Sequence, residues 1–140
     1  MSCAYSWPLQ QALHGALSAR PELSALVGGR IHDEAPADDA LIGDDAAWVL
    51  LGDEQVSPWA TASDAGAAHI VTLSVISTHR GFAVAKQVAG AVCEVALGPL
   101  KLSRGRVVNA GFLGAKTRRL AAGPARRIDL RFRIVIEDQA

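Results

Sequence analysis

The stretch from His69 to Leu97, HIVTLSVISTHRGFAVAKQVAGAVCEVAL, constrains the fold most, because its hydrophobic period changes halfway along. Before the polar STHRG segment, Val71, Leu73 and Val75 share one face at a period of two, which predicts a strand. Between Phe82 and Ala96 the apolar residues recur at a period near 3.6, which predicts a helix. The stretch is therefore a strand joined to a helix by a short polar turn.

Two helices and a short strand are predicted ahead of this stretch. Residues 8–19 carry leucines at helical spacing, and Ser6 is available as an N-cap. The segment RPELSALVGGR, residues 20–30, is a second short helix that ends at its two glycines. A short strand is expected to begin in residues 30–33.

The sequence patterns that predict the remaining strands differ in strength. WVLLGDEQV, residues 48–56, reads as a strand that leaves the core at Gly52. The segments before and after it, DEAPADDALIGDDAA and SPWATASDAGAAH (residues 57–69), are low-propensity connections. Another strand is expected within residues 106–115. The clearest lies within residues 127–137, RIDLRFRIVIE, where apolar side chains alternate with Arg and Asp.

This order of elements defines a fold class. It runs helix, helix, strand, strand, strand, helix, strand, strand, which is typical of an α+β protein rather than of alternating βαβ units. We expect a largely antiparallel sheet of about five strands, packed with two to three helices. A chain of 140 residues suits one domain, so residues 1–140 are expected to form a single unit.

The sequence carries no sign of a membrane or secreted protein. No window approaches eighteen consecutive apolar residues, and the N-terminus lacks the basic start and apolar run of a signal peptide. We therefore expect a soluble, unsecreted protein without a membrane partner. Cys3 and Cys93 lie far apart without metal-ligand spacing, so both are expected to be reduced thiols.

Charge is distributed unevenly although the chain is neutral overall. Such polarity can be neutralised within one fold, between neighbouring copies or by a partner, and overall neutrality argues against a dedicated nucleic-acid binder. Residues 31–70 contain nine acids and no Lys or Arg: Asp33, Glu34, Asp38, Asp39, Asp44, Asp45, Asp53, Glu54 and Asp64. Residues 101–133 contain ten basic residues against Asp129 alone: Lys101, Arg104, Arg106, Lys116, Arg118, Arg119, Arg126, Arg127, Arg131 and Arg133.

Catalytic and metal-binding patterns are weak. His32 stands beside Asp33 and Glu34, which makes it a candidate base or metal ligand, but no second histidine follows at the spacing that shares a helical face. No serine lies in a GxSxG turn. GFLGAK, residues 111–116, lacks the spacing of a phosphate-binding loop. We therefore expect no enzyme activity and no cofactor.

Four blocks of the sequence resemble a known family. They are LQQALHGALSARPELSALVGGRIHD from Leu9, WVLLGDEQVSPWAT from Trp48, HIVTLSVISTHRGFAVAKQVAGAV from His69, and the closing strand ARRIDLRFRIVIED from Ala125. In this order they resemble the tail-terminator, or tail-completion, proteins of long-tailed phages, prophages and alphaproteobacterial gene transfer agents. The segments PADDALIGDDAA and GFLGAKTRRLAAGP depart from any pattern we recognise in that family.

The resemblance implies a structural virion protein at the neck between head and tail. Such a protein forms a ring, typically of six subunits, that stops growth of the tail tube and joins it to the head connector, or stopper. Its partners would be further copies of itself, the tail-tube protein and the connector. DNA would pass through the lumen without sequence-specific binding.

Within that reading, three kinds of site are expected. A tryptophan in a low-propensity connection favours an anchor that becomes ordered against a neighbour, although the alternative is that Trp59 folds back on its own domain. Opposite charges are expected to meet between copies. The subunit or tube interface is thus predicted at Trp59, Asp53, Glu54, Asp64, Arg118 and Arg119, and possible lumen-facing residues are Arg127, Arg131 and Arg133.

Two other functions remain open from the sequence. A small nucleic-acid-binding protein could use the basic C-terminal strand region, and it would bind generic duplex DNA with a strong salt dependence. An enzyme could act through His32 with Asp33 and Glu34. The arginine-bearing strand face itself is a solvated face, a protein interface or a DNA contact.

Overall fold

The computed structural model describes residues 3–33, 46–119 and 125–138. Helices and strands follow the predicted order. The helices are α1 (Ser6–Ala19), α2 (Pro21–Val27) and α3 (Ala83–Leu97). The strands are β1 (Ile31–His32), β2 (Ala47–Ala60), β3 (Ala65–Ser77), β4 (Arg106–Arg119) and β5 (Arg126–Glu137). None of the helices in these ranges is long and apolar enough to cross a membrane.

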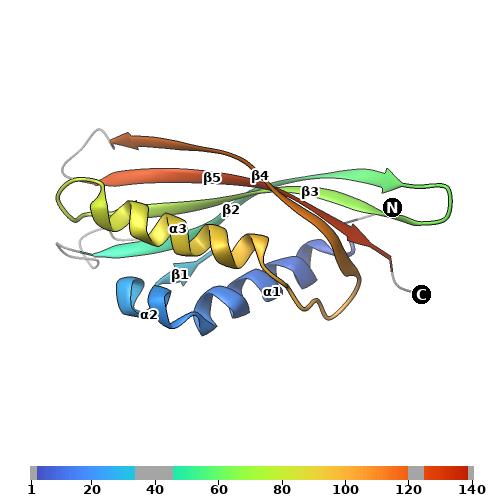
Figure 1. The fold of residues 1–140 in the computed structure, drawn as a ribbon, viewed down its shortest axis with the longest axis horizontal. Coiled ribbons are helices and arrows are strands. Elements are labelled where there is room, and N and C mark those ends of the chain that lie inside the picture. The colour runs from blue at the N-terminus through green and yellow to red at the C-terminus, as the bar shows by residue number, and fades with distance from the viewer. Residues whose placement is uncertain (1–2, 34–45, 120–124, 139–140) are drawn as a thin grey trace.

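All five strands belong to one sheet, in the order β1-β2-β3-β5-β4. The pairs β2–β3, β3–β5 and β4–β5 are antiparallel, and only the two-residue β1 runs parallel to β2. Figure 1 shows the three helices gathered on one face of this sheet. The predicted α+β fold with a largely antiparallel sheet is therefore confirmed.

Strand alternation decides which side chains meet the helices. Val71, Leu73 and Val75 of β3 all lie in the hydrophobic core, as the period of two predicts. The apolar residues of β5 from Ile128 to Ile136 do the same, and Phe132 is fully buried. Because successive side chains point to opposite faces, the polar residues between them must lie on the face without helices.

Small side chains let α3 approach the sheet closely. This helix packs across β3, β5 and β4, and its buried residues are alanines and valines, including Ala85, Val88, Val92 and Ala96. Because these side chains are small, the helix can lie close to the sheet and leave no space for water between them. The helical period predicted after STHRG is therefore confirmed, although Phe82 itself precedes the helix as its N-cap residue.

The predicted connection over residues 57–69 is wrong, because these residues form a β-hairpin. β2 leaves the core at Gly52, as predicted, but it does not end at Val56: it continues past a bulge between Leu51 and Glu54 as far as Ala60, and β3 already begins at Ala65. The turn is closed by the Thr61 N–H, which donates to the Asp64 carbonyl oxygen at 2.8 Å. Pairing with β3 supplies backbone hydrogen bonds that outweigh the low strand propensity of Gly, Ala and Ser in this segment.

Three smaller boundaries also differ from the sequence prediction. Ser6 is not the N-cap of α1 but its first residue, and Tyr5 occupies the cap without a side-chain hydrogen bond. β4 extends to Arg119, beyond the predicted end at residue 115, because it pairs with β5 throughout. The connection predicted over residues 33–47 falls mostly outside the described residues.

Gly66 marks a close approach between β3 and β5. A Cβ atom placed there would lie 1.9 Å from the Ile136 carbonyl oxygen, far inside van der Waals contact. The obstacle is backbone rather than a movable side chain, so any larger residue must push the two strands apart. Gly66 is thus required by the pairing of β3 with β5.

We predict that Gly66→Ala destabilises the protein by about 2 kcal/mol or more, because the new methyl group forces a backbone shift in the sheet. Gly90→Ala in α3 is the matched control, since nothing lies within 4 Å of the added Cβ, and it should stabilise by about 0.5–1 kcal/mol through helix propensity. Denaturant unfolding measures both changes. Equal effects of the two substitutions would contradict the close approach.

Candidate assembly surfaces

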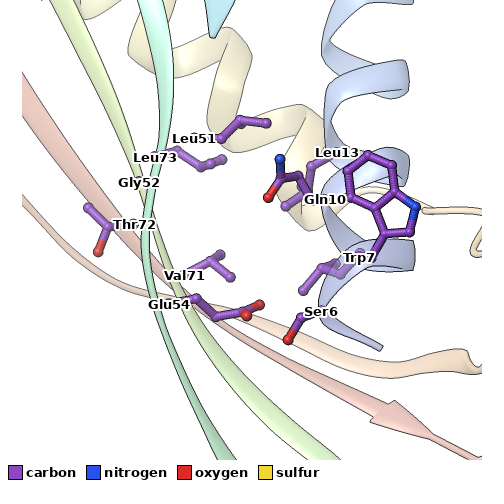
Figure 2. Close-up of a pocket in the computed structure, with 11 residues that line it drawn as sticks. Ser6, Trp7, Gln10, Leu13, Leu51, Gly52, Glu54, Val71, Thr72 and Leu73 are labelled. Carbon is purple, nitrogen blue, oxygen red and sulfur yellow. The ribbon is translucent and has the colours of Figure 1, made fainter. Parts of the chain in front are cut away.

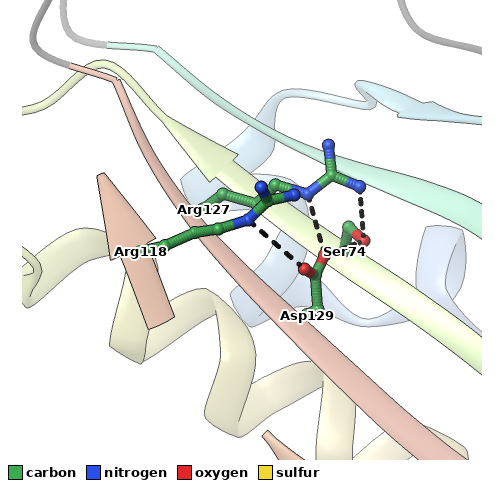
Figure 3. A network of polar contacts seen from close by, with 4 residues as sticks. All are labelled: Ser74, Arg118, Arg127 and Asp129. Carbon is green, nitrogen blue, oxygen red and sulfur yellow. Dashed lines mark hydrogen bonds and ion pairs between the residues drawn. The ribbon is translucent and has the colours of Figure 1, made fainter. Parts of the chain in front are cut away.

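The helix-free face of the sheet carries a polar network across three strands. Ser74 of β3 pairs in register with Asp129 of β5, and Arg127 pairs with Arg118 of β4. The Ser74 hydroxyl donates to Asp129 Oδ1 at 2.6 Å, and Arg127 Nε donates to the same oxygen at 2.8 Å. Arg118 Nε lies 3.7 Å from Asp129 Oδ2. Figure 3 shows the carboxylate held between the two guanidinium groups.

Asp129 is held in its ionised form by this network. Burial raises the pKa of Asp129, but hydrogen bonds from Ser74 and Arg127 and the charges of Arg127 and Arg118 outweigh it, so the pKa lies below its usual value. The carboxylate therefore neutralises part of the positive charge beside it. The sequence alone suggested this possibility, because Asp129 is the one acid among the C-terminal basic residues.

A broad groove of about 560 Å³ lies over this network on the same face. Its charged lining comprises Lys116, Arg118, Arg127 and Arg131 together with Asp53 and Asp129. Four cations against two carboxylates leave the groove positive. It joins residues of β2, β4 and β5 that are far apart in the sequence, and it is the strongest concentration of charge on this face among the described residues.

The three predicted lumen-facing arginines share this face but differ in their contacts and exposure. Arg127 is engaged by Asp129, Arg131 is exposed and lines the groove, and Arg133 is half-buried opposite Gly111. Lys116 also lines the groove, although the sequence prediction named it only among the basic residues and not as a site residue. The alternation of Lys116 and Arg118 in AKTRR was the signal that could have extended the strand.

The predicted interface residues fall in three separate places. Asp53 and Arg118 both line the basic groove, whereas Glu54 points to the helix-covered face and Asp64 lies in the hairpin turn. Arg119 is exposed at the last position of β4. The β-bulge between Leu51 and Glu54 adds one residue to β2 and shifts the alternation of the strand. Glu54 therefore lies opposite Val71, on the helix-covered face, whereas Asp53 lines the groove on the other face.

Trp59 lies in β2, directly opposite Gly66, and is half-buried. It is therefore part of a hydrogen-bonded hairpin and not of an irregular loop, which corrects the local structure expected for it.

Glu54 forms a partly buried pair with His69. His69 is fully buried, and its Nδ1 lies 3.0 Å from Glu54 Oε2. An ionised carboxylate only accepts hydrogen bonds, so the ring nitrogen donates. The hydrogen bond from His69 lowers the pKa of Glu54, assisted by Ser6, against the opposing effect of burial. The pair links β2 to β3 within the hairpin.

Beside this pair, a cleft of about 220 Å³ lies between α1 and the β2–β3 strands. Figure 2 shows Gln10 directed from α1 toward the strands, Trp7 lying on α1 itself, and Glu54 and Ser6 at one end of the cleft. The cleft walls are mainly apolar: Leu9, Leu13, Leu51, Val71 and Leu73. Trp7 is 62% exposed although it adjoins these walls.

His32 and Asp33, the residues of the enzyme hypothesis, lie in a shallow groove between β1 and α1. Asp33 Oδ2 accepts a long hydrogen bond of 3.4 Å from Gln10 Nε2. Glu34 lies outside the described residues. Within the described ranges, no group of three or more His, Cys, Asp or Glu side chains could hold a metal ion.

These surfaces belong to a helix-backed sheet protein with one open, charged face. A family model described as "Tail completion protein gp17" matches residues 11–137. A chain in the solved virion of a native gene transfer agent particle is 41% identical, with a TM-score of 0.84, over 97% of this chain and 99% of that chain. No curated protein sequence matches at a significant level.

The chain belongs to the tail completion protein gp17 family, because the family model spans nearly its whole length. It is therefore a structural tail protein, and its place is in the virion. The resemblance drawn from the sequence blocks is confirmed at the level of the family.

We predict that Glu54 contributes about 1–2 kcal/mol of stability at pH 7 through its bond to His69. Because its pKa in the folded state lies below the usual 4.5, this contribution is present above that pH and is lost as pH falls through the lowered value. The difference in unfolding free energy between wild type and Glu54→Gln should therefore shrink in acid. Asp53→Asn, at the exposed neighbouring carboxylate, should change stability by less than about 0.5 kcal/mol. A Glu54→Gln effect that is constant from pH 7 to pH 3 would contradict the pairing.

Proposed function

We propose that this protein forms a ring, of six copies as its family resemblance implies, that ends growth of the tail tube and joins the tube to the head connector. The observation that carries the proposal is the 41% identity, over nearly the full length of both chains, to a chain of a gene transfer agent virion. At that identity and coverage, surfaces as well as the core are expected to correspond. The role is structural, without catalysis.

The distribution of charge suits a ring of identical subunits. Each copy in a ring must present two different surfaces that meet head to tail. Exposed acids lie on the β1–β2 side of the sheet: Asp33 directly after β1, Asp53 on β2 and Asp64 in the turn after β2. Arg106, Lys116, Arg118 and Arg119 lie on β4, at the other side. Exposed ion pairs add only about 0–1 kcal/mol each, so they fix register while apolar contacts supply affinity.

The helix-free face is the surface we assign to the lumen. Its groove is positive, yet Asp129 holds Arg127 and moderates the charge. Contacts from Arg131 and Lys116 to phosphates would be sequence-independent and weakened by salt, which suits DNA that must pass rather than stay. A dedicated nucleic-acid binder would instead hold duplex DNA tightly as a free subunit.

Imaging tests the ring function directly. Purified protein mixed with assembling tail-tube protein should produce tubes that stop growing and carry a ring of tube diameter at one end. Tube protein alone should continue to elongate. Unchanged tube growth, together with salt-sensitive binding of generic duplex DNA by the free subunit, would favour the nucleic-acid-binding alternative.

We predict that Trp59 acts at an interface. Trp59→Ala should cost the free subunit about 1 kcal/mol or less, because the side chain is only half-buried. Tube capping should weaken by about 30-fold or more, which corresponds to the roughly 2 kcal/mol of a central interface anchor.

Trp48→Ala in the same strand is the matched control. Trp48 is 6% exposed, so its loss should destabilise the free subunit by about 3 kcal/mol or more. Thermal or denaturant unfolding and a capping titration separate the two behaviours. If Trp59→Ala destabilises the subunit as strongly as Trp48→Ala and the folded variant caps normally, Trp59 belongs to the core of its own subunit.

A further inference from the structure

Large apolar side chains are exposed at both edges of the sheet. In the described part of the chain, the exposed ones are Trp7 (62%), Phe112 (48%), Leu113 (47%) and Leu97 (42%). Phe112 and Leu113 lie on β4, which has β5 as its only strand neighbour in this part. Trp7 stands beside β2, which beyond Leu50 pairs only with β3. Open edges of this kind are places where chains associate.

We propose that the β4 edge of one copy docks against the α1–β2 edge of the next, with Leu113 entering the cleft between α1 and β2. This inference rests on the proposed ring and names the contact that would build it. The occupant of the cleft is thus a second copy of this chain. Leu113 is suited to the role because it sits at the bulge between Phe112 and Gly114, where the strand leaves its regular pairing.

The cleft has the size and chemistry to receive such a side chain. Its volume of about 220 Å³ exceeds the roughly 150 Å³ of a cavity known to hold benzene. Its walls are mainly leucine and valine, and Trp7 at the rim can cover the inserted group. Burial of an exposed leucine and an exposed indole in one contact provides the apolar affinity that ion pairs do not supply.

Charge around the two edges favours this pairing over its alternatives. Lys116, Arg118 and Arg119 follow Leu113 along β4, whereas Asp33, Asp53 and Glu54 adjoin the cleft or the strand beside it. Two β4 edges meeting each other would place these cations side by side, which is unfavourable. A head-to-tail contact brings opposite charges together and leaves the resulting pair with one free β4 edge and one free α1–β2 edge, so association continues until a ring closes.

The test uses one variant for each edge. Leu113→Asp removes the inserted side chain and opposes the acidic edge, and Trp7→Arg removes the rim and opposes the basic edge. Both residues are exposed, so both variants should fold, which thermal unfolding checks; Leu113→Ala is the milder substitute if Leu113→Asp does not fold. Gln87→Asp and Gln87→Arg, on the exposed face of α3, are controls for the charge changes.

Sedimentation and native mass spectrometry should find self-association of each edge variant weakened by at least about 30-fold, with the Gln87 controls unchanged. A mixture of the two edge variants should form one-to-one dimers, since the intact β4 edge of Trp7→Arg still finds the intact cleft of Leu113→Asp. If wild type associates only on tube ends, capping efficiency replaces mass as the measurement.

Three results would overturn the contact. Wild-type rings or caps formed equally well by both edge variants would reject it while the ring function stands. Dimers formed by Trp7→Arg alone would indicate β4–β4 pairing instead. A wild-type protein that neither associates nor caps tubes would reject the contact together with the proposed function.

Discussion

The structure depends on β3, which pairs with β2 on one side and with β5 on the other. Twelve of its thirteen residues have a register partner in β2 and twelve have one in β5, so strand pairing satisfies most of its backbone groups. Val71, Leu73 and Val75 then face the helices, while Ser74 and Thr72 face the opposite side. Because β3 sets the register of both neighbours, it also decides that Glu54 reaches His69 on one face and that Asp129 reaches Ser74 on the other. The register of β3 therefore determines both which residues form the hydrophobic core and which polar residues meet on the open face.

Sequence periodicity predicted what depends on local pattern. The order of all eight elements, the core faces of β3 and β5, and the helical period of α3 follow from apolar spacing that these segments carry by themselves. It failed for the hairpin segment that was predicted as a connection, from Ser57 to Ala68, where Gly, Ala and Ser have little strand propensity and tertiary pairing decides the conformation. It also could not predict the groove, because Asp53, Lys116 and Arg131 come together only through the register of separate strands and two bulges.

The helices cover one face of the sheet and leave the other face exposed in the isolated subunit. The helices bury the apolar side of the strands, and the other side keeps a charge network in which one carboxylate restrains two guanidinium groups. Among the described residues, β4 and the part of β2 beyond Leu50 have a strand neighbour on one side only. For a member of a tail-completion family, such surfaces are the ones available for neighbours in the virion. We expect assembly to bury apolar side chains that stay exposed in the isolated subunit.

The orientation of the sheet within an assembled particle is the central claim, and a high-resolution image of the ring on a tail end tests it most directly. We expect the helix-free face, with Lys116 and Arg131, to line the channel and α3 to lie away from it. A ring whose channel is lined by α3, or mainly by acidic side chains, would show that the sheet is oriented differently.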